Sequence, residues 1–160
     1  MANVARVLRE RIGAVALAGL AAVVSSCAAP DVAGSYRLDL VSHDSACPDR
    51  DIADRLDNVE LEVLQDGRDL NAELRVIPVL AEVGLVGETT FDGVALRSVD
   101  TYSGERVGTC RMTYAYRLSL ELHAGGRVTG TLVQEGANPA SGCAPARCRA
   151  TWEVSGARSD

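Results

Sequence analysis

The chain has 160 residues, 47% of them hydrophobic, and a formal net charge of −6. This length accommodates one domain with a single hydrophobic core. The acidic balance excludes nucleic acid as an expected partner, because binding to phosphates requires a basic surface.

The N-terminal segment has the order of a secretory signal peptide: basic, then apolar, then small residues. Three arginines precede an uncharged apolar stretch, Ile12–Val24, and two serines then lead to Cys27. The stretch is shorter than the roughly 20 residues that a helix needs to cross a bilayer. We therefore expect residues 1–26 to be removed, which leaves a mature chain with a net charge of −8.

The four residues Val24-Ser25-Ser26-Cys27 resemble the lipobox of bacterial lipoproteins. The resemblance implies a diacylglycerol thioether on Cys27, cleavage after Ser26 and acylation of the new amine, for example with palmitate. It also implies a location in the cell envelope. With Ala28 next, that location is the outer membrane of a Gram-negative host, or otherwise the outer face of the cell membrane. The alternative is an ordinary secretory signal followed by a coincidental cysteine.

Four further cysteines follow: Cys47, Cys110, Cys143 and Cys148. An even number in an exported chain indicates two disulfides, with three possible pairings. A metal site is the alternative, but it would require clustered ligands at short spacing.

From Gly34 onward, the dominant hydrophobic period is two residues, which predicts half-buried strands. The clearest case runs from Cys110 to His123, where apolar and polar residues alternate throughout. Weaker versions occur at 36–40, 59–63, 70–76, 85–91, 94–96, 128–132 and 148–154. Glycine-containing tight-turn signals near residues 66, 92 and 125 separate some of these segments.

Eight consecutive strands predict an all-β fold, an antiparallel up-and-down barrel stapled by disulfides, because closure removes exposed edges. Closure rather than an open sandwich follows here only from the strand count. We expect residues 34–160 to form this one domain, after a lipidated N-terminus and short linker at 27–33. The tight turns would share one end with the N-terminus. The loops 41–58, 77–83, 101–108 and 136–147, with all four cysteines, would lie at the end away from the membrane.

Barrel closure also ranks the disulfide pairings. The last strand would lie beside the first, which places Cys148 near Cys47, and Cys143 can fold back over the start of the strand at Cys110. The expected pairing is therefore Cys47–Cys148 with Cys110–Cys143. A Cys143–Cys148 bridge would instead leave the other two cysteines three strands apart, roughly 14 Å at about 4.8 Å per strand. That separation exceeds the roughly 7 Å Cα limit of a disulfide.

The tripeptide Gly34-Ser35-Tyr36 is similar to the Gly-x-Trp that opens the first strand of lipocalins, with tyrosine in place of tryptophan. The eight-strand pattern over residues 34–156 likewise looks like the lipocalin and streptavidin class of barrels. This resemblance implies a calyx that holds a small apolar ligand.

Candidate catalytic groups are sparse. Ser42-His43-Asp44 has the composition of a triad, but neighbours on an extended chain point to opposite sides, whereas a triad requires convergence. His123 falls on the polar face of its strand. The predicted inward positions contain no Asp, Glu, Lys or His, so we expect no enzyme activity and no cofactor.

The acidic segment Pro48–Asp57 has two interpretations. Its aspartates suggest calcium ligands, but an EF-hand loop requires an oxygen ligand and a glycine where Ala53 and Asp54 stand. The alternative is one or two helical turns whose Ile52 and Leu56 rest on the barrel mouth.

Two non-enzymatic functions compete. The first is an interaction or envelope-structural domain, with a packed barrel whose long-loop end contacts another protein, protease inhibition being one variant. The second is a lipocalin-like binder of a small apolar ligand inside the barrel.

Overall fold

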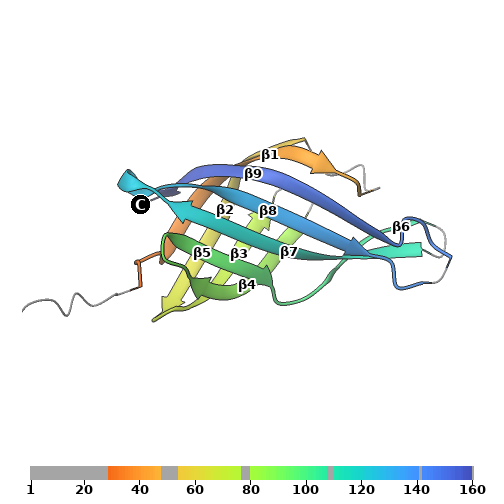
Figure 1. The fold of residues 1–160 in the computed structure, drawn as a ribbon, viewed down its shortest axis with the longest axis horizontal. Coiled ribbons are helices and arrows are strands. Elements are labelled where there is room, and N and C mark those ends of the chain that lie inside the picture. Colours follow the sequence, from red (N-terminus) through yellow and green to blue (C-terminus); the bar gives the residue numbers. More distant parts are fainter. Residues whose placement is uncertain (1–28, 48–53, 77–79, 108–109, 141, 160) are drawn as a thin grey trace, which may run out of the picture.

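The computed structural model describes residues 29–47, 54–76, 80–107, 110–140 and 142–159. Within these ranges nearly all of the chain is antiparallel strand (Figure 1). The elements are β1 (Gly34–Ser45), β2 (Arg55–Asp66), β3 (Asp69–Val76), β4 (Leu80–Thr89), β5 (Gly93–Ser98), β6 (Tyr102–Val107), β7 (Cys110–Leu122), the short 3-10 helix η1 (Ala124–Gly126), β8 (Arg127–Ala137) and β9 (Arg147–Ser159).

Eight of these strands close into a barrel. The sheet runs in the order β5-β4-β3-β2-β1-β9-β8-β7, and β5 then pairs with β7 to complete the ring. The closing ladder joins Gly93–Arg97 to Arg117–Glu121 in antiparallel register. The predicted eight-stranded up-and-down barrel is therefore confirmed, and β1 and β9 lie side by side as closure requires.

β6 is a strand where the sequence predicts a loop over 101–108. β5 covers the second half of β7, whereas β6 pairs with its first half, between Cys110 and Tyr114. At the break between them, the backbone N–H of Tyr116 donates to Ser98 Oγ at 3.0 Å. β6 thus forms because the first half of β7 would otherwise have unpaired backbone N–H and C=O groups on that side. The hydrophobic pattern of the sequence does not reveal this need for backbone pairing.

The β1–β2 hairpin is also longer than the sequence predicts. Its pairing continues past a bulge at Leu38/Leu40 to Leu56 and Arg55, so much of the expected 41–58 loop is strand. Asn58 takes a left-handed φ of 60° at this bulge, and its N–H donates to Asp39 Oδ1 at 3.1 Å. The expected helical turn is therefore wrong for residues 55–57, because cross-strand hydrogen bonds outcompete it. Residues 48–53, with the calcium candidates Asp49 and Asp51, lie outside the described residues.

The two ends of the barrel differ as expected. The β2–β3, β4–β5 and β7–β8 turns share one end, which we call the tight-turn end, and both ends of the described chain lie there (Figure 1). Gly67 at φ 63° permits the two-residue β2–β3 turn. Cys47, Cys110, Cys143 and Cys148 lie at the opposite end, which we call the long-loop end. The β5–β6 connection instead runs beside the middle of β7.

The two disulfides have the pairing expected from the sequence. Cys47, just after β1, bonds to Cys148 near the start of β9, with 4.8 Å between Cα atoms. Cys110, at the start of β7, bonds to Cys143 with a Cα separation of 5.7 Å. Both bonds therefore staple the long-loop end.

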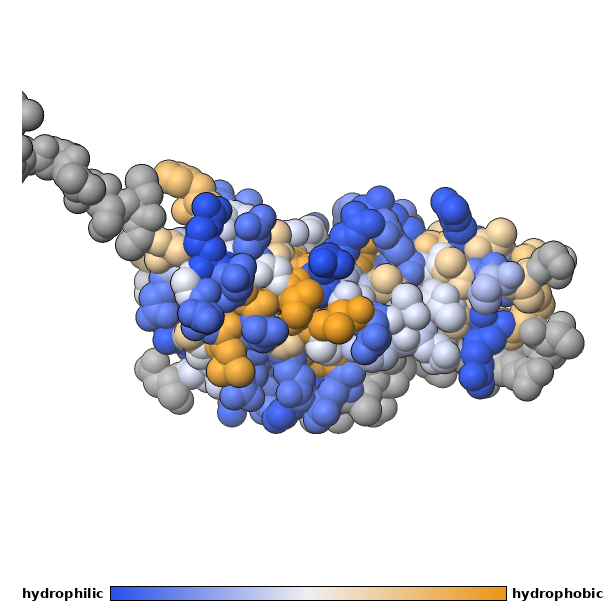
Figure 2. All heavy atoms as spheres, turned by 90° about the horizontal axis from the view of Figure 1, so that it is seen from below, coloured by the Kyte–Doolittle hydropathy of each residue, from blue (hydrophilic) through white to orange (hydrophobic). Residues whose placement is uncertain are grey.

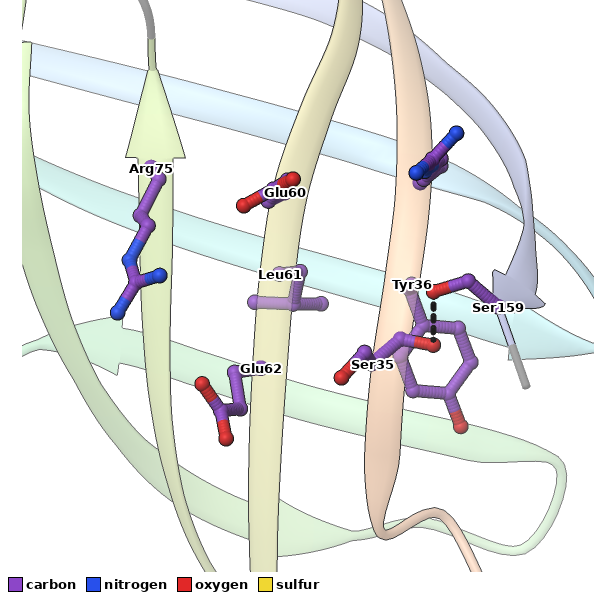
Figure 3. A pocket seen from close by; sticks show the side chains of 8 residues that line it. Ser35, Tyr36, Glu60, Leu61, Glu62, Arg75 and Ser159 are labelled. Carbon is purple, nitrogen blue, oxygen red and sulfur yellow. Dashed lines mark hydrogen bonds between the residues drawn. The ribbon is translucent and has the colours of Figure 1, made fainter.

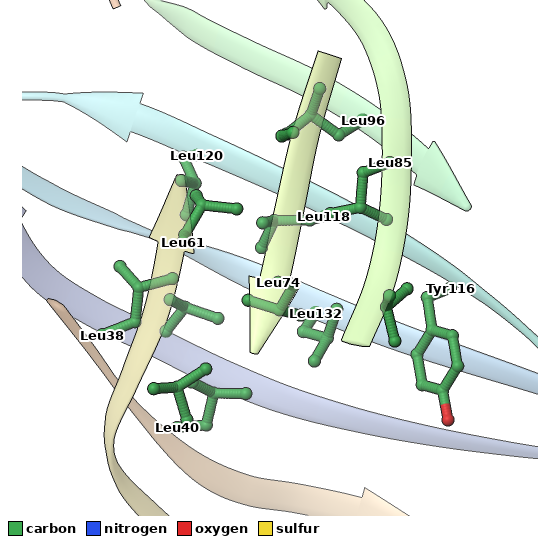
Figure 4. Close-up of a cluster of buried hydrophobic side chains, with 14 of the residues drawn as sticks. Leu38, Leu40, Leu61, Leu74, Leu85, Leu96, Tyr116, Leu118, Leu120 and Leu132 are labelled. Carbon is green, nitrogen blue, oxygen red and sulfur yellow. The ribbon is translucent and has the colours of Figure 1, made fainter. Parts of the chain in front are cut away.

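Leucines fill the centre of the barrel. Buried leucine side chains from seven of the eight barrel strands meet there, among them those drawn in Figure 4, and Leu38, Leu74 and Leu118 are each only 1% exposed. The face seen in Figure 2 is mostly hydrophilic, with a hydrophobic group near its middle and weakly hydrophobic residues at both ends. The two-residue hydrophobic period arises because alternate side chains of each strand point into the barrel and out to solvent.

Candidate functional site

The tight-turn end of the barrel is plugged by the chain that precedes β1. Val32 is 1% exposed, although the sequence suggests a linker at this position. The cavity left beside it measures only about 10 Å³, at the lower limit of what one water requires. Its lining comes from five strands and the plug: Val32, Tyr36, Val63, Val94, Leu120, Leu122 and Val128. This mouth is therefore closed by a side chain of the protein itself.

Hydrogen bonds from Gln65 hold the plug in place. The Val32 N–H donates to Gln65 Oε1 at 2.8 Å, and Gln65 Nε2 donates to the Pro30 carbonyl at 3.1 Å. The same amide also reaches the Gly67 carbonyl at 2.8 Å, which fixes its orientation. We call residues 30–33 the strap, because one side-chain amide binds their backbone much as a neighbouring strand would.

Tyr36 supports the strap from inside the barrel. Its hydroxyl donates to the Val32 carbonyl at 2.9 Å, and the residue is only 3% exposed. Burial raises the pKa of Tyr36 above its ordinary value, with nearby Arg158 opposing and Asp31 reinforcing the shift. The neutral phenol is therefore the form that suits this hydrogen bond.

The interior changes character toward the long-loop end, where aromatic and polar side chains replace leucine. Met112, Tyr114, Tyr116, Gln134 and Trp152 are all buried on the inward face. Gln134 stands opposite both Tyr116 on β7 and Ala150 on β9. Among the described residues, the Trp152 Nε1–H is buried without a hydrogen-bond partner. Thr89 Oγ1 at the end of β4 is the other buried side-chain atom of the described residues without a partner. An unmade buried hydrogen bond costs about 1–3 kcal/mol, so both are unfavourable in the folded protein.

Packing against the Cys47–Cys148 disulfide is tight. A Cβ on Gly136 would collide with the side chains of Met112, Tyr114 and Cys148. Only glycine at position 136 therefore leaves room for these three side chains to pack against β8. Tyr102 packs edge-on against Tyr116, with ring centroids 5.8 Å apart, and its hydroxyl accepts the Gly84 N–H at 3.0 Å.

The outer wall carries a shallow groove of about 170 Å³ over β1, β2 and β3 (Figure 3). Charged side chains of both signs line it, including Arg37, Glu60 and Arg75. Arg75 Nε contacts Glu73 at 3.0 Å and Glu82 at 3.8 Å. Exposed ion pairs of this kind contribute little to stability and do not define a ligand chemistry.

The serine, histidine and aspartate of the triad-like tripeptide do not assemble a catalytic site. They lie at a β-bulge in β1, where the pairing with β9 shifts between Ser42 and Asp44. His43 Nδ1 is 3.8 Å from Glu153 on the exposed outer face. His123 Nε2 lies 2.6 Å from Thr129 Oγ1, also in an exposed position.

Cys27, the expected lipidation site, lies outside the described residues. In the part of the chain that is described, no three His, Cys, Asp or Glu side chains gather closely enough to hold a metal ion. The described ranges also contain no helix with the length and hydrophobicity needed to span a membrane. No protein-family model matches the sequence, and no curated protein is significantly similar to it.

Sequence reasoning missed the strap and the role of Gln65. Val32 stands alone between Asp31 and Ala33, so no apolar period marks it for burial. A polar residue at the end of a strand likewise resembles ordinary turn chemistry. Val32 is buried only because the closed barrel brings side chains from five strands around it.

Replacement of Tyr36 by phenylalanine tests the strap. The variant loses the hydrogen bond to Val32, so we expect a loss of about 0.5–1.5 kcal/mol in unfolding free energy near pH 7. Since the folded-state pKa of Tyr36 is raised, its contribution is present below about pH 10 and is lost as the pH rises through that pKa. Urea unfolding across this range should therefore show a steeper alkaline loss for the wild type. Parallel pH profiles would contradict the assignment.

Proposed function

We propose that the protein is a membrane-anchored bacterial lipoprotein with a non-enzymatic role. Its barrel acts as a packed scaffold that presents the long-loop end to another protein. The observation that carries the scaffold role is the interior filled by leucines, with only about 10 Å³ left beside Val32. An eight-stranded barrel is just wide enough for side chains to fill it, so leucines in these positions leave little room for a ligand.

The anchor is supported by the lipobox-like residues that end in Cys27. Lipid chains on this cysteine would attach the tight-turn end to a membrane, because the strap fixes Pro30 at that mouth. β7 alone has 13 residues, which at about 3.4 Å each extend over about 40 Å. The long-loop end would then project from the outer membrane of a Gram-negative host, or from the outer face of the cell membrane otherwise.

The long-loop end has features that suit recognition of a protein. Two disulfides stiffen it, and rigidly held loops are where binding residues concentrate. Exposed arginines stand on the strands that begin there: Arg111 on β7, and Arg147 and Arg149 on β9. Exposed Asp44 and Asp54 stand at the same end, which therefore carries both charges, and the arginines favour carboxylates of a partner at their own strands.

Replacement of Cys27 by alanine tests the anchor. We expect the wild type to fractionate with membranes and to incorporate labelled palmitate. The variant should lose the label and appear in the soluble fraction, because it has no thiol to carry the lipid. Ser26→Ala is the matched control, since it keeps a small residue before the cysteine. A Cys27→Ala protein that stays membrane-bound would refute the lipoprotein assignment.

A second candidate is a lipocalin-like binder, and one observation favours it. The unpartnered Trp152 Nε1–H and the buried amide of Gln134 could serve an apolar ligand with one hydrogen-bond acceptor. In this role the ligand would enter from the long-loop end, because Val32 closes the other mouth.

Native mass spectrometry of the protein purified from its own host discriminates the two candidates. The scaffold role predicts a bare barrel and a cross-linked protein partner. Arg147→Glu should weaken partner capture, because Arg147 begins β9 at the long-loop end. Arg127→Glu should leave capture unchanged, because Arg127 begins β8 at the tight-turn end. A stoichiometric small molecule that is lost in Trp152→Phe would instead support the binder.

A further inference from the structure

Phe91 is the most exposed large hydrophobic residue in the described part of the chain. It is the only phenylalanine of the protein, stands in the β4–β5 turn, and has a relative exposure of 102%. Tight turns ordinarily carry small or polar residues, as Asp92 and Gly93 do here. Folding therefore buries none of this side chain, and its apolar surface is left for a partner.

The turn that carries Phe91 is held firmly. Across the turn, the Thr90 N–H donates to the Gly93 carbonyl at 2.8 Å, and Thr90 Oγ1 donates to Asp92 Oδ1 at 3.2 Å. Hydrogen bonds also tie the turn to both neighbouring turns. The Thr89 N–H donates to the Arg68 carbonyl at 2.9 Å, and the Leu122 N–H donates to the Asp92 carbonyl at 2.8 Å. Phe91 is thus presented on a fixed platform, which limits the entropy lost on binding.

The same end of the barrel holds the start of the described chain. Val32 of the strap shares its small cavity with Val94 on β5, the strand that follows the turn, and with Leu122 on β7, which pairs with β5. Only three residue steps separate Pro30 from Cys27, a reach of at most about 11 Å. A lipid on Cys27 would therefore bring this turn to the membrane surface.

We propose that Phe91 is a second membrane contact, a side chain that inserts into the lipid interface beside the anchor. The inference rests on the proposed lipid anchorage, because the anchor supplies the proximity. Apolar and aromatic side chains at an interface bury their surface at the boundary between headgroups and acyl chains. The contact orients the barrel, since two attachment points restrict its tilt where one does not.

Charge on this end does not select anionic lipids. The three turns that surround Phe91 carry both signs, with Arg68 and Arg127 offset by Asp66, Asp69 and Asp92. The contact is therefore apolar in origin. It should persist in zwitterionic membranes and change little with salt.

Brominated-lipid quenching of a tryptophan at position 91 tests the contact. Lipidated Phe91→Trp protein, purified from membranes and reconstituted into phosphatidylcholine vesicles, should lose about half of its added emission when the acyl chains are brominated near the headgroup. Val99→Trp is the matched control, because Val99 is 59% exposed but follows the far end of β5. The native Trp152 is inside the barrel and provides the constant background.

Three outcomes are distinguishable. Quenching of the Phe91→Trp protein without quenching of the Val99→Trp protein supports the contact. Vesicle-bound protein with neither tryptophan quenched overturns the contact and leaves the anchor intact. Protein that carries no lipid and does not sediment with vesicles overturns the proposed anchorage, and the inference with it.

Discussion

Closure of the sheet by the β5–β7 ladder is the constraint on which the rest of the structure depends. It pairs β5 with β7, the two strands that would otherwise be edges of the sheet, and encloses the leucine face from solvent. It also leaves the first half of β7 without a partner on that side, which β6 then supplies. The ring also contains the β1–β9 ladder, which joins the first and last strands and brings Cys148 to Cys47.

The interior that results is uneven along the barrel axis. Valine, leucine and a tyrosine seal the tight-turn end, where the strap completes the packing. Larger and more polar groups occupy the other half, beneath the two disulfides. This gradient makes one end suited to lying against a surface, while the other end carries the disulfides, the exposed arginines and the unsatisfied indole. Each proposed function depends on this difference between the two ends of the barrel.

Much of this architecture could be predicted from the sequence, because a two-residue period and glycine turns depend on local chemistry. The disulfide pairing that the sequence favours was also confirmed, since closure sets Cys148 beside Cys47 and strand spacing argues against a Cys143–Cys148 bridge. β6 and the strand at Arg55–Asp57 were not, because main-chain pairing to a longer neighbour decides them. Val32 could not be recognised either, as its burial depends on a mouth built by strands distant in sequence. The candidate ligand groups Gln134 and Trp152 needed the assembled interior.

Native-state hydrogen exchange of the closing ladder tests the account most directly. If β5 and β7 seal the barrel, the amides of Leu96 and Leu118 should exchange only through global unfolding, as slowly as those of Asp39 and Ser155 in the β1–β9 ladder. Exchange of the β5–β7 amides at a much lower free energy than the β1–β9 amides would show a sheet that opens at this seam. That result would contradict the closed and packed barrel.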